Sequence, residues 1–276
     1  MSIQWFPGHM AKARRILQEQ LKWVDVAIEL GDARVPQSSR NPLLQELLGG
    51  KPKLVILNKA DLADPAQTER WLAALRATSP VYAVSAVMGT GVARIVPMVE
   101  KLAASRLAQL AGKGIRPRPV RVMVVGIPNT GKSSLINQLA GGSKAKTGNK
   151  PGVTRGNQWI RVHERVELLD TPGILWPKFE DPEVGRRLAA TGAVRDEVVD
   201  AEDLARWVLA WLEATYPADT QGWLPGKEAG DSLEAFGRKR GCLVRGGEVD
   251  LLKAAQVFLR EFRQGRLGRF TLDRLA

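Results

Sequence analysis

The sequence is poor in the residues that cross-link small secreted proteins or bind zinc. It has one cysteine, Cys242, and two histidines in 276 residues. A single cysteine excludes an internal disulfide, and there is no cysteine cluster that could hold zinc. Such low cysteine usage fits a reducing compartment.

Long apolar stretches are also missing. The opening residues, MSIQWFPGHMAKARR, lack the apolar core of a signal peptide. No apolar run in the sequence reaches the length that crosses a bilayer. We therefore expect a cytoplasmic protein that does not enter a membrane.

Acidic residues are scarce relative to basic ones. The 41 Lys and Arg outnumber the 29 Asp and Glu, for a formal net charge of +12 and a pI near 10.1. This balance indicates a polyanionic partner, with nucleic acid first and an anionic membrane surface second. A basic surface that is merely solvated would give the same composition.

The order of predicted elements indicates two domains. Hydrophobic residues make up 44% of the chain, which is enough for more than one core. Strand and helix patterns alternate as far as about residue 178, and this alternation predicts a doubly wound, mostly parallel sheet. Only helical patterns follow residue 182. We expect an α/β domain over residues 1–180 and a small all-α domain over residues 181–276.

The most specific motif is a phosphate-binding loop. Residues 126–133 read GIPNTGKS and fit the pattern G-x-x-x-x-G-K-[ST]. Its glycines let backbone N–H groups curl round phosphates, Lys132 supplies a charge, and Ser133 offers a hydroxyl to Mg²⁺. A plain glycine-rich turn is the alternative, but a predicted strand precedes the motif and a predicted helix follows it. The candidate nucleotide contacts of this loop are Asn129, Thr130, Gly131, Lys132, Ser133 and Ser134.

Two later segments extend the phosphate and metal site. Asp170, in LLDTPG, ends an apolar strand, where a carboxylate linked to Mg²⁺ belongs in phosphate-loop enzymes. Gly173 can place its N–H near a γ-phosphate. Thr154 lies between the phosphate loop and Asp170 and is the candidate second metal hydroxyl. By itself, Asp-Thr-Pro-Gly could be a simple turn.

A candidate guanine-reading loop precedes the phosphate loop. Asn58, Lys59 and Asp61 form N-K-x-D after an apolar strand, and ligands bind at such strand ends in open α/β sheets. Asp61 can accept two hydrogen bonds from guanine, whereas adenine offers no matching pair. Lys59 can lie over the base plane, and Asn58 can tie this loop to the phosphate loop. The next predicted strand ends in Ser85 and Ala86, the usual companion loop at the guanine edge.

These parts occur in a rotated order. The guanine loop and the Ser-Ala loop come first, and the phosphate loop and Asp-Thr-Pro-Gly follow. A domain whose original termini lie close together tolerates such a circular permutation. We expect the new connection in the Gly-, Pro- and Arg-rich stretch at residues 111–121. The fold class predicted is therefore a circularly permuted P-loop GTPase domain followed by the helical domain.

Several long motifs together resemble one family. They are IQWFPGHMAKARR, DARVPQSSRNP, NKADL, GIPNTGKSSLIN, KPGVTRGNQW, LLDTPGILWPKFEDPEVGRRLAATGAV and GRKRGCLVRGGEVD. They resemble the circularly permuted ribosome biogenesis GTPases of the YlqF/RbgA family. The resemblance implies a bacterial, cytoplasmic enzyme that hydrolyses GTP to GDP, uses Mg²⁺, and acts late in assembly of the large (50S) ribosomal subunit. It also implies that the C-terminal domain binds rRNA, and we expect a monomer.

The sequence does not decide which group orients the attacking water. Ras-like GTPases place a Gln just after the Asp-x-x-Gly motif, but Ile174 stands there in this chain. His9, a group from the partner, or a metal ion could replace it. The resemblance implies His9 as a catalytic residue beside Lys132 and Thr154. It also implies that Asn129 can bind K⁺, which is the candidate second cofactor.

Basic residues of the helical domain are candidate RNA contacts, with a solvated face as the alternative. They are Arg186, Arg187, Arg238, Lys239, Arg240 and Arg245.

The sequence leaves two other functions open. One is a GTP-gated RNA-binding switch with little turnover of its own, and the other is a GTPase of another RNA-maturation pathway, such as tRNA modification.

Overall fold

The computed structural model describes residues 7–141, 159–169, 181–194, 196–220, 222–223 and 231–275. Side chains are described for these residues except 7–13, 43 and 198. The chain divides into two compact units. An α/β unit comprises residues 4–178 and 271–276, and a helical unit comprises residues 1–3 and 179–270. The last residues therefore belong with the sheet, whereas the sequence placed them in the helical domain.

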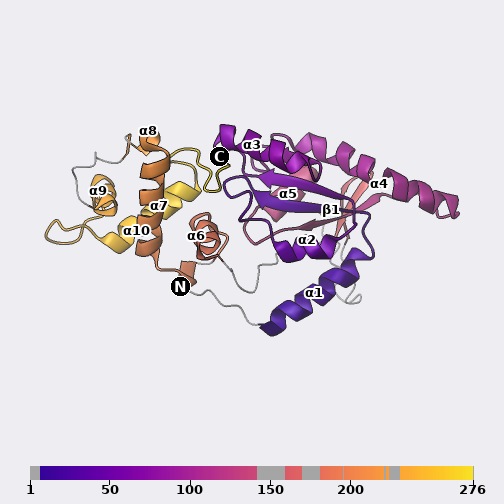
Figure 1. Cartoon of the computed structure of the whole chain (residues 1–276), viewed down its shortest axis with the longest axis horizontal. Coiled ribbons are helices and arrows are strands. Elements are labelled where there is room, and N and C mark those ends of the chain that lie inside the picture. The colour runs from indigo at the N-terminus through magenta and orange to yellow at the C-terminus, as the bar shows by residue number, and fades with distance from the viewer. Residues whose placement is uncertain are drawn as a thin grey trace. The chain divides into compact units, whose positions relative to one another are not determined.

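The α/β unit is built on one six-stranded sheet (Figure 1). Its strands lie in the order β3-β2-β1-β4-β6-β5, and β5 alone is antiparallel to its neighbour. The strands are β1 (Val26–Asp32), β2 (Lys53–Asn58), β3 (Val81–Ala83), β4 (Val120–Val125), β5 (Trp159–His163) and β6 (Val166–Leu169). Every residue of β1 is buried, as expected for a central strand that is covered on both faces.

Helices cover both faces of this sheet. They are α1 (Pro7–Leu21), α2 (Pro42–Leu48), α3 (Pro65–Arg76), the 3₁₀ turn η1 (Val92–Arg94), α4 (Ile95–Gly112) and α5 (Lys132–Leu139). Ile28 packs in one cluster with Val99 of α4 and Leu135 of α5. Its chain neighbour Ala27 packs on the opposite face with Leu17 of α1. Because successive strand residues point to opposite faces, this alternation makes the sheet doubly wound.

The helical unit has an aromatic core. Its helices are α6 (Pro182–Ala190), the 3₁₀ turn η2 (Asp196–Val198), α7 (Ala201–Thr215), α8 (Pro217–Thr220), α9 (Ser232–Lys239) and α10 (Leu251–Arg263). Phe236 of α9 meets Phe258 of α10 edge to face, with ring centroids 5.3 Å apart. Aspartates cap α6, α7, α9 and α10 with their side chains, which satisfies N–H groups that the first turn leaves free. No helix in the described parts of either unit is long and apolar enough to cross a membrane.

The C-terminal residues are fastened to the α/β unit. The buried carboxylate of Asp273 accepts hydrogen bonds from the backbone N–H groups of Gln37 (2.8 Å) and Ser38 (2.6 Å). The indole of Trp71 donates to the Asp273 carbonyl at 2.8 Å. Ordering the chain end in this way requires such specific partners, because a free terminus would otherwise fray.

Candidate active site

The site is positioned by the carboxyl ends of three parallel strands. Asp32 at the end of β1 lies in register with Asn58 at the end of β2, and β4 leads directly into the loop that starts at Gly126. In an open parallel sheet, such ends form the edge at which ligands bind. The topology therefore brings the two candidate nucleotide loops together at one edge.

The phosphate loop fits against β1 and β2 only because two of its residues lack a side chain. A Cβ at Gly126 would lie 2.4 Å from the carbonyl oxygen of Leu30, and a Cβ at Gly131 would lie 2.4 Å from Nδ2 of Asn58. Gly131 also has a φ of 93° and precedes the first residue of α5. Glycine alone meets both demands without strain, since L-residues rarely adopt this backbone conformation. The backbone thus forms an open cradle at the N-terminus of α5.

Lys132 is held inside this cradle. Its ammonium donates to the carbonyl oxygens of Gly126 (3.1 Å) and Ile127 (2.8 Å). Burial lowers the pKa of Lys132 to about 8, because the ammonium has lost water without gaining an anionic partner. A bound phosphate would supply that partner, so the site is built to receive an anion.

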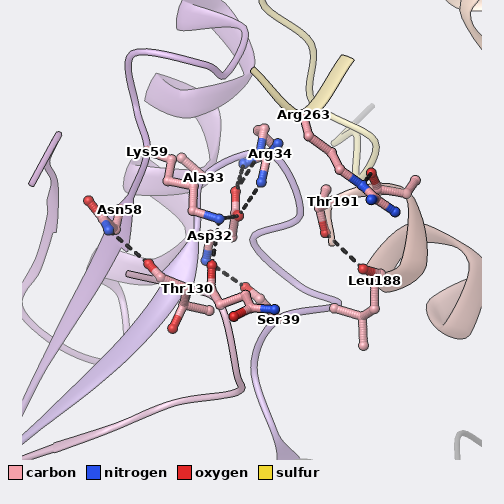
Figure 2. A network of polar contacts seen from close by, with 12 residues as sticks. Asp32, Ala33, Arg34, Ser39, Asn58, Lys59, Thr130, Leu188, Thr191 and Arg263 are labelled. Atoms are coloured by element: carbon pink, nitrogen blue, oxygen red, sulfur yellow. Dashed lines mark hydrogen bonds and ion pairs between the residues drawn. The ribbon is translucent and has the colours of Figure 1, made fainter. Parts of the chain in front are cut away.

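Asn58 connects three loops. Its Nδ2 donates to the carbonyl oxygen of Thr130 at 2.8 Å, and its Oδ1 accepts from the backbone N–H of Ala86 at 2.9 Å. The side chain is buried, so both bonds satisfy polar groups that water cannot reach. The guanine-loop candidate, the Ser-Ala loop and the phosphate loop therefore share one buried amide. Figure 2 shows its bond to Thr130.

Lys59 and Asp61 have different surroundings. Lys59 Nζ donates to the carbonyl oxygen of Asn129 at 2.6 Å and pairs with Asp32 Oδ2 at 2.9 Å. Asp61 is partly exposed, and its carboxylate has no hydrogen bond or ion pair within the described parts of the chain. Both carboxylate oxygens of Asp61 can therefore accept bonds from a base.

The comparisons agree with this geometry. The family described as "50S ribosome-binding GTPase" matches residues 121–228. A protein of Bacillus cereus named Ribosome biogenesis GTPase A is 48% identical, and the match covers 99% of this chain and 94% of that protein. The chain belongs to this family. It is a GTPase that acts in ribosome biogenesis.

Other members of the family and their structures extend the likeness. The Ribosome biogenesis GTPase A of Thermotoga maritima is 31% identical over 99% of this chain and 94% of that protein. The crystal structure of GNP-bound YlqF from T. maritima superposes with a TM-score of 0.68 at 26% identity, covering 95% of this chain and 98% of that one. The permuted arrangement is consistent with the family, because β4, which leads into the phosphate loop, is the fourth strand in the chain.

An ion network at the end of β1 is the part of this GTPase site that the sequence did not reveal. Asp32 Oδ2 accepts from Arg34 Nη2 at 2.7 Å and from Lys59 at 2.9 Å, with all three side chains clustered in Figure 2. Burial by itself would raise the pKa of Asp32, but Arg34 and Lys59 outweigh it and hold the pKa well below the ordinary range. The only sequence signal was the segment Gly-Asp-Ala-Arg after a predicted strand. It gave no hint that Asp32 supports the lysine of the guanine loop.

Several predicted site residues lie where little or nothing is described. Thr154, Asp170 and Gly173 fall outside the described residues, and so does Ile174, the position at which Ras-like GTPases have the water-orienting Gln. His9 is part of α1, but its side chain is not described. Ser133 and Ser134 stand exposed in the first turn of α5, and Ser85 is buried, with its Oγ accepting from the Met88 N–H at 3.2 Å.

Three of the six predicted RNA contacts of the helical unit are paired with carboxylates. Arg186 pairs with Glu183 at 2.9 Å, Arg238 with Glu234 at 2.9 Å, and Arg240 with Glu261 at 2.8 Å. The three remaining residues differ: Arg187 is partly buried, Lys239 is exposed and donates to the Gly222 carbonyl, and Arg245 is exposed. Exposed ion pairs contribute little to stability and can exchange partners. These pairs therefore neither exclude nor identify an RNA contact.

Proposed function

We propose that this GTPase hydrolyses GTP while bound to a late precursor of the large ribosomal subunit, and that hydrolysis releases it. The proposal is supported most by Asn58, whose amide joins the base-reading and phosphate-binding loops, together with relatives named for ribosome biogenesis. A nucleotide bridging these loops would order both at once. Whether GTP or GDP is bound would then shift the conformational equilibrium of the residues that follow the Asp-Thr-Pro-Gly motif.

In this proposal the base and phosphates are held by separate loops. Asp61 reads N1–H and the exocyclic amine of guanine, with Ser85 and Ala86 at the base edge. The backbone from Asn129 to Ser134 and the ammonium of Lys132 surround the phosphates. The missing Cβ atoms at Gly126 and Gly131 let the phosphate loop pack against β1 and Asn58, which holds its backbone where the phosphates would bind.

Mg²⁺ is the cofactor expected of a GTPase of this family. The hydroxyl of Ser133, exposed at the start of α5, suits it, and Thr154 and Asp170 are the other proposed ligands. Bound there, Mg²⁺ would neutralise charge that develops on the phosphates. The residues of this chain would position GTP, and the bound phosphates would keep Lys132 charged.

His9 is the proposed water-orienting residue. An apolar Ile174 cannot hydrogen-bond water, whereas an imidazole can near neutral pH. K⁺ held by Asn129 is the competing source of catalytic assistance, supplying positive charge beside the phosphates. A group from the ribosomal partner is the third candidate.

We further propose a monomeric, cytoplasmic protein, with rRNA contacts in the helical unit at Arg186, Arg187, Arg238, Lys239, Arg240 and Arg245.

The test is steady-state GTP hydrolysis by the wild type and His9→Ala, with and without purified large subunits, in K⁺ and in Na⁺. The chain offers a matched control, because His163 is its other histidine. His163 lies on β5, where its Nδ1 accepts from the Arg165 N–H. We expect subunits to stimulate the wild type and His163→Ala strongly, and His9→Ala hardly at all despite retained subunit binding.

Four other outcomes would redirect the proposal. Equal stimulation of His9→Ala and wild type removes His9 from the mechanism. Turnover that needs K⁺ but not His9 assigns the missing charge to the cation. Negligible turnover with subunits, but GTP-dependent binding to them, favours the RNA-binding switch, and absence of subunit binding favours another RNA-maturation pathway.

A further inference from the structure

The net positive charge of the chain lies in the α/β unit and not in the helical unit, for which rRNA contacts are proposed. The helical unit, residues 1–3 and 179–270, carries 14 Lys and Arg against 16 Asp and Glu, a net charge of −2. The α/β unit carries 27 Lys and Arg against 13 Asp and Glu, a net charge of +14. A polyanion approaching the protein is therefore attracted to the α/β unit, because the summed charge sets the long-range field.

Within the α/β unit, one stretch is unusually basic and exposed. Residues 94–121 contain seven Lys and Arg and one Glu. Only Ile95, Val99 and Ala103 of α4 are buried, all in its first half. The second half of α4 runs out beyond the strands (Figure 1). It leads into residues 113–117, every one of which is exposed.

The topology places this stretch at the edge of the sheet opposite the nucleotide loops. α4 follows the carboxyl end of β3 and returns to the start of β4, and β1, β2 and β4 are parallel. Residues that precede these strands therefore share the same edge. Trp23, three residues before β1, is 58% exposed, and Lys51, two residues before β2, bonds the Val24 carbonyl at 2.8 Å.

Charges from different segments meet at this edge. Burial, and then the positive charge of Arg106 on α4, lower the pKa of Lys51, whereas the carboxylate of Asp25 raises it. Arg106, Lys113 and Arg116 have no ion pair with any carboxylate in the described parts of the chain. Like charges gathered without counterions cost free energy, and an anionic ligand would relieve that cost.

The acidic groups of this edge are already neutralised. The buried carboxylate of Asp25 pairs with Arg118 at 2.7 Å, and Glu100 pairs with Arg165 at 3.1 Å. These pairs leave the outer cations uncompensated. We name the set formed by the exposed Trp23, Arg106, Lys113 and Arg116 and the partly buried Lys51 the amino-edge surface.

We propose that the amino-edge surface is an RNA-binding surface, in which Arg106, Lys113 and Arg116 contact backbone phosphates and Trp23 stacks on an unpaired base. Lys and Arg that neutralise phosphates release counterions, and an exposed indole offers a stacking platform to any base. A membrane is disfavoured, because Leu107 and Leu110 in the second half of α4 are partly buried, and its exposed residues are Ala, Ser, Gln, Gly and Arg rather than the apolar face of an interfacial helix. The inference rests on the proposed function for the choice of RNA over other polyanions.

The test compares two triple variants that each remove three positive charges. One is Arg106→Ala with Lys113→Ala and Arg116→Ala, and the other is Lys253→Ala with Arg260→Ala and Arg266→Ala in the helical unit. All six residues are exposed. Dissociation constants for large ribosomal subunits and for deproteinised large-subunit rRNA are measured over a series of salt concentrations.

We expect the amino-edge variant to bind rRNA at least about tenfold more weakly, with a salt slope smaller by about 2 to 3, and the helical variant to change much less. Trp23→Ala should weaken binding at all salt concentrations, and Trp23→Phe should restore most of it. Nucleotide affinity and unstimulated GTP hydrolysis of the amino-edge variant should match the wild type, because the substitutions lie at the opposite edge of the sheet. These two controls show that the variant is folded.

Each contrary outcome is distinguishable. Wild-type affinity and salt slope in the amino-edge variant, or equal losses in both triples, overturn the inference while leaving the proposed function standing. Weaker binding to intact subunits with unchanged binding to deproteinised rRNA overturns it in favour of a ribosomal protein as the partner. If the wild type binds neither subunits nor rRNA, the proposed function itself fails.

Discussion

Asn58 Nδ2 lies 2.8 Å from the Thr130 carbonyl oxygen, and the same side chain accepts the N–H of Ala86 at 2.9 Å. Asn58→Ala would leave both backbone groups buried without partners, each at a cost of about 1 to 3 kcal/mol. We expect lower thermal stability and GTP affinity weakened by at least about tenfold. Calorimetry and equilibrium nucleotide titration measure the two effects.

Asn58→Asp tests the two hydrogen bonds of Asn58 separately. The carboxylate still accepts from Ala86 but loses the donor to Thr130, and it introduces a charge near the phosphate loop. We expect it to bind GTP more weakly than Asn58→Ala, because the added charge repels phosphate. Equal affinities would show that the bond to Thr130, and not the charge, decides nucleotide binding.

Asp32→Asn should uncouple the guanine loop from β1. The substitution removes the buried carboxylate that pairs with both Arg34 and Lys59, at a cost of about 3 kcal/mol. The folded-state pKa of Asp32 is depressed, so its contribution to stability is present above the unfolded pKa and is lost as pH falls. The stability difference from wild type should therefore be full above about pH 5 and shrink below about pH 4. Denaturant unfolding at several pH values measures it.

Glu29→Gln is the matched control on the same strand. Glu29 is buried and pairs with Arg40 at 3.0 Å, but it is not bonded to the nucleotide loops. We expect both variants to lose stability and only Asp32→Asn to lose GTP affinity, because Lys59 depends on Asp32. A similar loss of affinity in both would mean that general destabilisation, and not the position of Lys59, is responsible.

Lys132 should make nucleotide binding depend on pH. Its pKa is about 8 in the free protein because of burial, and bound phosphate would raise it. Binding should therefore take up protons at pH values above about 8, and affinity should fall as pH rises through that value. Isothermal titration calorimetry in buffers of different ionisation enthalpy measures the uptake. Lys132→Met controls for titration of the nucleotide itself, and an uptake that persists in that variant would assign the effect elsewhere.

Asp61→Asn should exchange the base preference. The carboxylate can accept from the N1–H and the exocyclic amine of guanine, whereas an amide also donates and can pair with the carbonyl that xanthine carries instead of the amine. We expect affinity for guanine nucleotides to fall by about 100-fold or more and affinity for xanthine nucleotides to rise. Competition titrations with both nucleotides measure this. Unchanged preference would place the base away from Asp61.

The sequence by itself determined the alternation of strands and helices and the presence of a phosphate-binding motif. Glycine spacing at residues 126–131 and the alternation of strands and helices depend on local backbone geometry and periodicity, which a sequence records directly. The permuted order of motifs followed from reading them along the chain. The family to which the chain belongs and its GTPase activity agree with that interpretation.

Only the tertiary structure decided which distant residues act together. The pairing of Asp32 with Lys59, the bond from Asn58 to Thr130, and the position of Trp23 and residues 113–117 at the same edge of the sheet depend on strand register and helix packing. The placement of Asp273 on the loop at Ser38 joins residues 235 positions apart. Such contacts arise from burial and complementary hydrogen bonding between segments, and no local pattern encodes them. The uneven charge of the two units likewise became visible only when the structure showed where one unit ends and the other begins.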